Sequence, residues 1–410
     1  MRSNVTIGLT CGLITGLVAA MPAQRGGGRA ASTPVGVTAD PVRMLVGRLD
    51  LDRYKSTIKG LTMFGDRRQG TDRNRRAIDW IEAQLKSYGC ANTERLTYDY
   101  QPAPPAPRPA GTGRAGTGLA QGGGQPRGFR IPTSVNTDPL KQPDLTLRAL
   151  NSQPTVPGPR EEVYCTKVGA TRPDEMYIVS AHMDGHGWGE AANDDGSGTA
   201  LVMELARVLS HPDVRTDRSI RFILWNNEET GLNGSRAYVE QRKDRQGQED
   251  PPGSGQYPEP KWLGMIQHDM MLFDHGMPLA NGSIPKAQRP EADVNNEFQV
   301  ASKFAAESQA LAWAFEVANE KYATDYPASV GSHMTNTDSG PFQDEVAAIS
   351  LRENERGTQI GNGWDPQWHQ PTDVYATYSD KDFRLGLNAA QTTLAAVAQL
   401  TGATIKSATP

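Results

Sequence analysis

Strand-like apolar runs that alternate with amphipathic helical stretches constrain the fold of this chain more than any other feature. Residues 176–181 and 218–225 have the length and apolar content of buried strands, and between them residues 196–209 place Leu201 and Leu205 on one helical face. Strands that alternate with helices form a sheet covered by helices on both faces. We therefore expect an α/β fold, a three-layer α/β/α sandwich around a mostly parallel, mixed central sheet.

The same patterns extend along the chain and predict one folded domain, residues 42–405. Further helices are predicted at residues 71–88, 232–240, 300–323 and 380–400, and further strands at residues 95–100, 161–169, 263–268 and 347–351. Residues 101–128 are dense in Pro and Gly, which predicts a flexible insertion. The polar residues 243–260 are predicted to form a long surface loop.

The first residues have the pattern of an export signal. Arg2 precedes an apolar run at residues 5–20 that ends in small residues, so we expect a signal peptide at residues 1–23 and a flexible tail at 24–41. A membrane anchor is the alternative, but the run is short for a span of about 20 residues. We expect an exported protein, periplasmic or extracellular, with no stable membrane span after cleavage.

The net charge and the cysteine content limit the possible binding partners and bear on the cellular compartment. The net charge of -5 provides no basic field for nucleic acid. Once Cys11 is removed with the signal, Cys90 and Cys165 remain. In an oxidising compartment they could form a disulfide, and two buried thiols are the alternative.

Acidic residues and a histidine gather directly after, or close to, the strand-like runs. Carboxylates with a few imidazoles suit zinc, and adjacent acids repel each other unless a cation offsets them. The three segments are His182-Met183-Asp184, Asn193-Asp194-Asp195-Gly196-Ser197-Gly198 and Glu228-Glu229. They predict a metal centre at the strand ends, where α/β folds display their functional groups.

His182 and Asp184, in the histidine segment, are expected to have different roles. His182 ends a predicted strand, and Asp184 lies two positions further on. A ligating histidine usually donates its other ring N–H to a carboxylate, so we expect Asp184 to orient His182. His186 is interpreted as a solvated loop histidine.

The paired acids are also expected to divide their roles. Helix capping explains one acid before the helix at 196–209 but not two, so we expect Asp194 to bind metal and Asp195 to support it. Of the adjacent acids Glu228 and Glu229, one is expected to bind metal while its neighbour faces a metal-bound water.

Together these motifs resemble the secreted di-zinc aminopeptidases of metallopeptidase clan MH. His-x-Asp, Asn-Asp-Asp-Gly-Ser-Gly and Glu-Glu-Thr-Gly-Leu-Asn-Gly-Ser occur in the family's order, and residues 64–67 fit as well. The resemblance runs from about residue 50 to about residue 400, apart from the Pro/Gly-rich segment. The group includes bacterial leucyl aminopeptidases, glutamate carboxypeptidase II and glutaminyl cyclases.

The resemblance implies two zinc ions and a full set of ligands. It adds Asp269 and His369 to the ligands and makes Asp373 the orienting partner of His369. The implied first zinc site is His182, Asp194 and Asp269, and the second is Glu229, His369 and the bridging Asp194. It also implies Glu228 as general base and a cis peptide between Asp194 and Asp195.

The activity implied is removal of N-terminal residues from peptide substrates by a zinc-activated water. A carboxypeptidase or dipeptidase is the alternative within the family, with Arg352 or Arg356 binding the substrate carboxylate. A glutaminyl cyclase with one zinc is a second alternative, and a binding scaffold without activity is a third.

One part of the family pattern is missing. Relatives often provide an oxyanion-stabilising Tyr, and residues 331–339 contain none. His333 or Asn336 could substitute for it, and Asp338 could bind substrate or serve the structure alone. Residues 243–260 and 274–290 are the expected walls of the specificity pocket, and the oligomeric state and preferred substrate residue stay open.

Overall fold

The computed structural model describes residues 40–90, 92–101, 135–273, 294–332, 336–353 and 365–406. They belong to one compact unit, Asp40–Pro410. The predicted signal peptide, residues 24–39 of the predicted tail and nearly all of the Pro/Gly-rich insertion lie outside the described residues. In the part of the chain that is described, no helix is both long and apolar enough to cross a membrane.

An eight-stranded mixed sheet forms the centre of this unit. Its strands, in spatial order, are β1 (Asn92–Tyr100), β2 (Gly158–Lys167), β5 (Arg218–Trp225), β3 (Arg172–His182), β6 (Lys261–His268), β9 (Ala348–Glu353), β7 (Val294–Phe298) and β8 (Ala328–Gly331). The central strands β5, β3, β6 and β9 are parallel, as are β7 and β8, whereas β1–β2, β2–β5 and β7–β9 pair antiparallel. The α/β fold with a mixed, mostly parallel sheet is thus confirmed.

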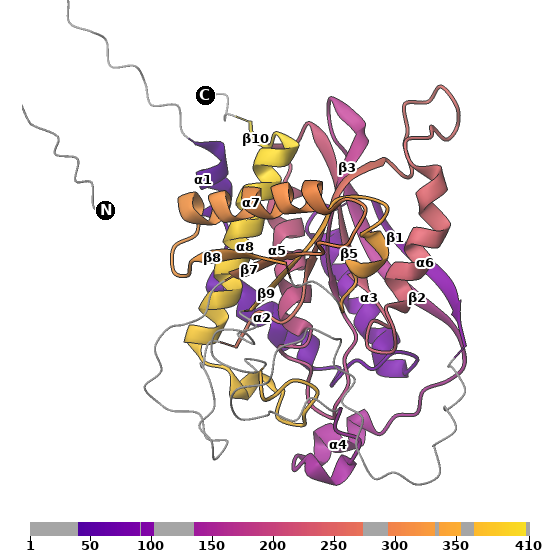
Figure 1. Cartoon of the computed structure of the whole chain (residues 1–410). Helices are drawn as coiled ribbons and strands as arrows, with labels where there is room; N and C mark the ends of the chain where they lie inside the picture. Colours follow the sequence, from indigo (N-terminus) through magenta and orange to yellow (C-terminus); the bar gives the residue numbers. More distant parts are fainter. Residues whose placement is uncertain are drawn as a thin grey trace, which may run out of the picture. The chain divides into compact units, whose positions relative to one another are not determined.

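Helices cover both faces of the sheet. The larger core lies under α1 (Pro41–Val46), α2 (Leu51–Thr62), α3 (Asp72–Ser87), α5 (Gly196–Leu209), α7 (Ala305–Tyr322) and α8 (Asp380–Thr401). The smaller core lies under α6 (Asn233–Arg242) and the 3-10 turn η3 (Gly340–Phe342). The remaining short elements are α4 (Leu145–Asn151), β4 (Val214–Arg215), β10 (Thr404–Ile405), η1 (Pro139–Lys141), η2 (Lys243–Arg245) and η4 (Tyr375–Thr377). Figure 1 shows α4 at the lower end of this unit and β10 at the upper end.

Strand β5 shows how the sequence serves both cores. Phe222 and Leu224 belong to the larger core, whereas Ile223 and Trp225 belong to the smaller one. Successive side chains of a strand point to opposite faces, so a strand segment that faces two apolar cores is apolar at consecutive positions. This explains the apolar run at residues 222–225, whereas the buried Arg221 of the same strand is paired with Glu259.

Several predicted elements have their expected bounds, and a few elements were not predicted. The helix at 196–209 and the strand at 218–225 are confirmed as α5 and β5. The closing helix is confirmed as α8, which begins with a capping box formed by Ser379 and Asp382. The helix predicted at 300–323 begins only at Ala305. The sequence patterns did not predict α1, α2, α4, β7 or β8.

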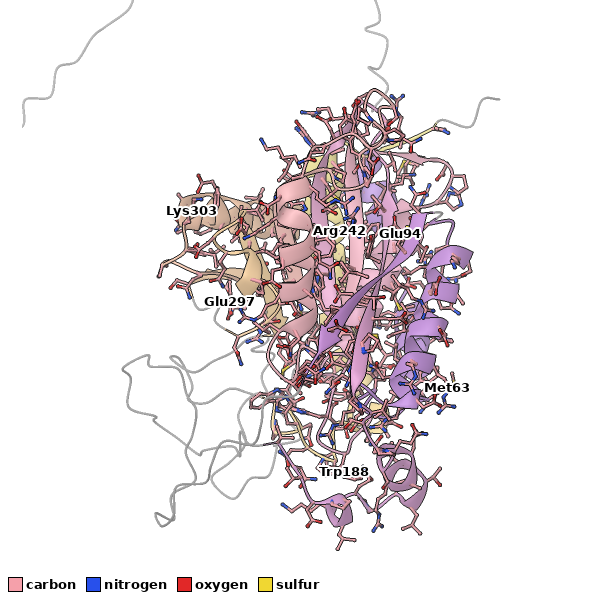
Figure 2. All side chains as sticks on the ribbon, turned by 90° about the vertical axis from the view of Figure 1, so that its right-hand side faces the viewer. Met63, Glu94, Trp188, Arg242, Glu297 and Lys303 are labelled. Atoms are coloured by element: carbon pink, nitrogen blue, oxygen red, sulfur yellow. A yellow bond between two sulfur atoms is a disulfide. The ribbon has the colours of Figure 1, made fainter. Side chains whose placement is uncertain are left out.

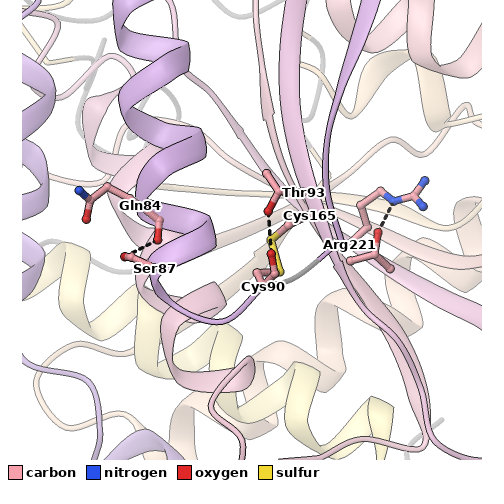
Figure 3. Close-up of a disulfide and its surroundings, with 7 residues drawn as sticks. Gln84, Ser87, Cys90, Thr93, Cys165 and Arg221 are labelled. Atoms are coloured by element: carbon pink, nitrogen blue, oxygen red, sulfur yellow. Dashed lines mark hydrogen bonds between the residues drawn. A yellow bond between two sulfur atoms is a disulfide. The ribbon is translucent and has the colours of Figure 1, made fainter.

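A disulfide joins Cys90 to Cys165 and resolves the two alternatives for these residues (Figure 3). Cys90 precedes β1, Cys165 lies within β2, and their Cα atoms are 5.9 Å apart, which suits a disulfide. The Thr93 hydroxyl donates a hydrogen bond of 2.7 Å to the carbonyl oxygen of Cys90. The disulfide therefore ties the segment after α3 to strand β2, which pairs with β1.

We expect the double variant Cys90→Ser/Cys165→Ser to be less stable by about 4 kcal/mol. The disulfide closes a loop with a sequence separation of 75 residues, and its loss restores that loop's freedom to the unfolded chain. Urea unfolding measures the difference. The reduced wild-type protein should match the variant; equal unfolding midpoints for the variant and the oxidised wild type would contradict the prediction.

Candidate metal centre

The predicted site residues lie at one edge of the sheet, at the carboxyl ends of the parallel strands. His182 is the last residue of β3, Asp269 directly follows β6, and Glu228 and Glu229 follow β5 after two asparagines. Asp194 lies in the loop before α5. Segments distant in sequence meet here because adjacent parallel strands end at the same edge.

The five predicted ligands come close together in two sets. The Nε2 atom of His182 lies 3.4 Å from Oδ1 of Asp194 and 3.8 Å from Oδ1 of Asp269. The Nε2 atom of His369 lies 3.0 Å from Oδ2 of Asp194 and 3.0 Å from Oε2 of Glu229. The two oxygens of Asp194 thus face two different histidines.

Several polar atoms of this centre are buried without a hydrogen-bond partner. They are Oδ2 of Asp194, Oε1 of Glu229, Nδ1 of His369 and Nε2 of His186. Leaving one such buried atom unpaired lowers the stability of the fold by about 1–3 kcal/mol. A cluster of unpaired atoms therefore needs an explanation. A bound cation explains it, and the described residues contain three groups with ligand atoms close enough to hold one: His186/Glu229/His369, His182/Asp194/Glu229 and His182/Asp195/Asp269.

The pKa shifts at the centre also indicate a need for positive charge. Burial alone would lower the pKa of His369, but the carboxylates of Glu229 and Asp194 raise it to about 10. Burial raises the pKa of Glu228 well above its usual range, and neighbouring acids add to the shift. A cation among these groups would favour neutral imidazoles and ionised carboxylates.

Asp195 supports the centre through backbone hydrogen bonds. Its carboxylate accepts N–H bonds from Gly198 at 2.8 Å and from His182 and Met270 at 3.2 Å each. It therefore caps α5 and joins it to the ends of β3 and β6. The peptide bond between Asp194 and Asp195 is cis, as the family resemblance implies.

Asp184 orients His182 in a different way from the one expected. The Nδ1 atom of His182 lies 3.0 Å from the main-chain carbonyl of Asp184 and 4.0 Å from its carboxylate. The carboxylate instead accepts the N–H of Glu228 at 3.0 Å. The turn after β3 brings the carbonyl to the ring, so the Asp184 side chain positions the predicted general base.

Asp373 likewise holds a loop rather than the expected ring. Its carboxylate accepts the N–H groups of Asn193 and Asp194 at 2.9 and 3.1 Å and the Tyr378 hydroxyl at 3.0 Å. The Nδ1 atom of His369 has no hydrogen-bond partner among the described residues. Asp373 therefore fixes the backbone that carries Asp194, and the expectation that it orients His369 is wrong.

His186 was interpreted as a solvated loop histidine, and the structure corrects this interpretation. Its Nε2 atom lies 3.0 Å from Oε2 of Glu229, and only 17% of its side chain is exposed. Its ring meets that of His369 edge to face, with centroids 4.1 Å apart. Figure 2 shows the nearby Trp188, on the same loop, at the lower end of this unit. The scarcity of histidines was the available signal in the sequence.

His333 and Asn336, the candidates to replace the missing Tyr, differ from Asp338 in their surroundings. His333 lies outside the described residues, and Asn336 is exposed. Asp338 is buried and accepts hydrogen bonds from Ser235 at 2.6 Å and Gln267 at 3.5 Å. Burial raises the pKa of Asp338 to about 7. These contacts give Asp338 a structural role in joining α6 to β6.

Two expectations about substrate recognition change with the structure. The buried Arg352 donates a hydrogen bond of 2.6 Å to Asp269, so its charge stabilises a predicted ligand. Residues 243–260 lead into β6 at Lys261, the amino end, whereas the centre lies beyond the carboxyl end of that strand. They therefore cannot wall a pocket at the centre. Arg356 and residues 274–290 lie outside the described residues.

Arg67, from the segment at 64–67, holds the loops beneath the centre. Its buried guanidinium donates to the carbonyl oxygens of Met183 at 2.7 Å, Glu190 and Ala191 at 2.8 Å each, and Gly65 at 3.2 Å. The arginine guanidinium is planar and has five N–H donors, so it can reach all of these acceptors at once. A lysine ammonium cannot, because it is a single compact group with three donors. One side chain thus fixes both ends of the loop between His182 and Asp194.

We expect Arg67→Lys to lower the free energy of unfolding by about 3 kcal/mol, because buried carbonyl oxygens lose their donors. Urea unfolding measures the change. Arg68→Lys is the matched control, since Arg68 is exposed next to it in sequence. If both variants unfold at the wild-type midpoint, Arg67 does not hold these loops.

Comparison with known proteins identifies the family. The model of peptidase family M28 matches residues 163–393, more than half of the chain. The chain belongs to peptidase family M28. The motif-based resemblance to metallopeptidases is confirmed at this level, and the matched segment includes every predicted zinc ligand.

Proteins with similar sequences include an aminopeptidase and a carboxypeptidase. A segment of 74 residues is 45% identical to aminopeptidase YwaD of Bacillus subtilis, covering 18% of this chain and 16% of that protein. A segment of 76 residues is 36% identical to carboxypeptidase Q of Xenopus laevis, again 18% of this chain and 16% of the relative. The matches thus span about a sixth of each relative's length.

A solved structure shows the shared fold. The chain superposes on a zinc aminopeptidase from Bacillus subtilis with a TM-score of 0.56 and 16% identity, covering 88% of this chain and 97% of that structure. At this identity the likeness establishes the fold alone.

Proposed function

We propose that this M28 protein is an exported aminopeptidase that uses two zinc ions and the general base Glu228. The observation that carries the proposal is the position of Asp194 between two sets of ligands. One of its oxygens faces His182 and the other faces His369. A carboxylate in this position can bridge two ions.

The donor set fits zinc at both positions. The first ion would be held by His182, Asp194 and Asp269, and the second by Asp194, Glu229 and His369. Nitrogen and carboxylate oxygen ligands bind zinc at about 2.0–2.2 Å, which places tetrahedral ligand atoms about 3.3–3.6 Å apart. The observed separations of 3.0–3.8 Å are close to this range.

The charge of the ligands supports the same assignment. Asp194, Glu229 and Asp269 bring three negative charges into a buried centre. Arg352 offsets part of this charge through Asp269. The orphaned oxygens of Asp194 and Glu229 still require a cation.

The chemistry follows from the neighbours of Glu228. Zinc ions, when bound, supply a Lewis acid that lowers the pKa of a water and polarises a peptide carbonyl. Glu228 would accept the proton of the attacking water and pass it to the leaving amine. The hydrogen bond from its backbone N–H to Asp184 holds Glu228 in place for both transfers.

An aminopeptidase is favoured over the alternative of a carboxypeptidase. A carboxypeptidase needs a cation for the substrate carboxylate, and Arg352, one of the two candidates, is bound to Asp269, while Arg356 lies outside the described residues. The identity of 45% to an aminopeptidase segment, against 36% to a carboxypeptidase Q segment, points the same way. A glutaminyl cyclase with one zinc is disfavoured because the ligands of two positions are present.

Export is supported by the disulfide between Cys90 and Cys165. Disulfides persist in oxidising compartments and are rare in the cytosol. The signal-like pattern of residues 1–23 is consistent with this compartment.

The test is hydrolysis of matched aminoacyl anilides and their N-acetylated counterparts by the zinc-loaded protein, with and without a chelator. We expect cleavage of the free-amine series alone, abolished by the chelator and restored by zinc. Cleavage of both series would contradict an aminopeptidase, and chelator-resistant cleavage would contradict the zinc mechanism.

A further inference from the structure

We propose that His186 is an additional ligand of the zinc ion held by Glu229 and His369, so that the two ions of the centre are inequivalent. The inference rests on the proposed function and deepens it. Neither the sequence motifs nor the family resemblance assigns a role to His186.

The geometry of three side chains carries the inference. The Nε2 atoms of His186 and His369 each lie 3.0 Å from Oε2 of Glu229. Ligand atoms of all three residues lie within 4.8 Å of one another. Two nitrogens and a carboxylate oxygen in this arrangement are a typical zinc donor set.

The His186 ring places its buried Nε2 atom beside the carboxylate of Glu229. Nε2 lies 3.0 Å from Oε2 of Glu229 and has no other partner among the described residues. The ring lies edge to face with that of His369, at 87°. Nε2 is therefore a buried nitrogen beside the carboxylate of a predicted ligand, where an ion bound by both groups would satisfy it.

The loop that carries His186 is shaped to deliver it to this point. Gly185 lies where a Cβ atom would be 2.5 Å from the Cβ of Ala191 and 2.9 Å from the carbonyl oxygen of Asp194. Gly187, with φ of +95°, lies where a Cβ atom would be 2.4 Å from the carbonyl oxygen of His369. The backbone on both sides of His186 thus passes directly against two predicted ligands, and only glycine allows this approach.

The consequence is a difference in how the two ions are held. With Asp194 bridging, the ion at His369 would have four protein ligands: His186, Asp194, Glu229 and His369. The ion at His182 would have three. Zinc sites with four protein ligands are closed, whereas catalytic sites keep a position open for water or substrate. The substrate carbonyl is therefore expected at the His182 ion, and the His369 ion should be lost more slowly.

The variant His186→Phe tests the inference, because phenylalanine keeps the ring packing against His369 and removes the nitrogen. The wild-type full-length chain, loaded with zinc and then treated with chelator, should lose one ion fast and one slowly. In His186→Phe we expect the slow ion to leave at least about 100-fold faster, beyond the roughly 10–100-fold effect of residues outside the ligand shell. His211→Phe is the matched control, since His211 is exposed and paired with Asp213.

A spectroscopic measurement provides a second, independent readout. With cobalt in place of zinc, the visible absorption of the wild type should differ from that of His186→Phe and match that of His211→Phe. Identical spectra and identical ion loss in wild type and His186→Phe would overturn the inference. So would a zinc-loaded crystal structure in which Nε2 of His186 lies outside the ligand distance of about 2.0–2.1 Å.

The outcomes separate this inference from the proposed function. If the wild type binds two ions and cleaves free-amine anilides while His186→Phe retains both ions like the wild type, only the role of His186 is wrong. If the wild type itself binds no zinc, the inference and the proposed function are both wrong.

Discussion

Glu228→Ala is expected to lower kcat by about 10³- to 10⁴-fold while both zinc ions stay bound. The zinc ligands lie on other side chains, so removal of this carboxylate leaves the ions in place. What is lost is the group that moves a proton from the water to the leaving amine. Burial raises the pKa of Glu228 well above its usual range in the protein without metal, and neighbouring zinc ions would return it to the ionised form.

The measurement is kcat on a free-amine anilide together with zinc per chain. Glu228→Gln, which keeps the shape of the side chain, should lose a similar factor. Glu240→Gln on the exposed surface of α6 is the control and should keep wild-type kcat. Wild-type turnover in Glu228→Ala with zinc bound would remove Glu228 from the mechanism.

Asp194→Asn is expected to remove both zinc ions and to abolish detectable activity. Each oxygen of Asp194 faces a different histidine, so one substitution weakens both ion positions. The asparagine keeps the shape of the side chain but loses the negative charge and one of the two ligand oxygens. Zinc per chain after gel filtration is the measurement.

Asp269→Asn is the informative comparison for Asp194→Asn. Of the two ligand histidines, Asp269 faces only His182, so its substitution should cost one ion and leave the other. If Asp194→Asn loses one ion and Asp269→Asn also loses one, Asp194 does not bridge the two positions.

The edge of the sheet that carries the site was predictable from the sequence because strand ends are marked by simple patterns. Apolar runs stop at His182 and shortly before Glu228, and each run has the length of a strand. Parallel strands bring such ends together without further information. Strand β7 and the edge strand β8 were not predictable in this way: β7 reads Val-Asn-Asn-Glu-Phe, and its pairing with β9 depends on tertiary contacts.

The finer contacts of the site depend on backbone direction, which residue patterns do not reveal. Asp184 contacts His182 through its carbonyl and Glu228 through its carboxylate, and no spacing distinguishes these two uses. Asp373 accepts the backbone N–H groups of two residues, and the sequence spacing did not reveal this contact either. His186 reaches Glu229 because two glycines let its loop pass against neighbouring backbone, which is visible only in three dimensions.

Zinc titration of the chelated full-length protein decides whether Asp194 bridges a pair of zinc ions. Bound zinc per chain is followed together with hydrolysis of a free-amine anilide. We predict saturation at two ions, and Asp194→Asn should bind neither tightly. Saturation at a single ion, or full hydrolysis by the chelated protein, would contradict the account.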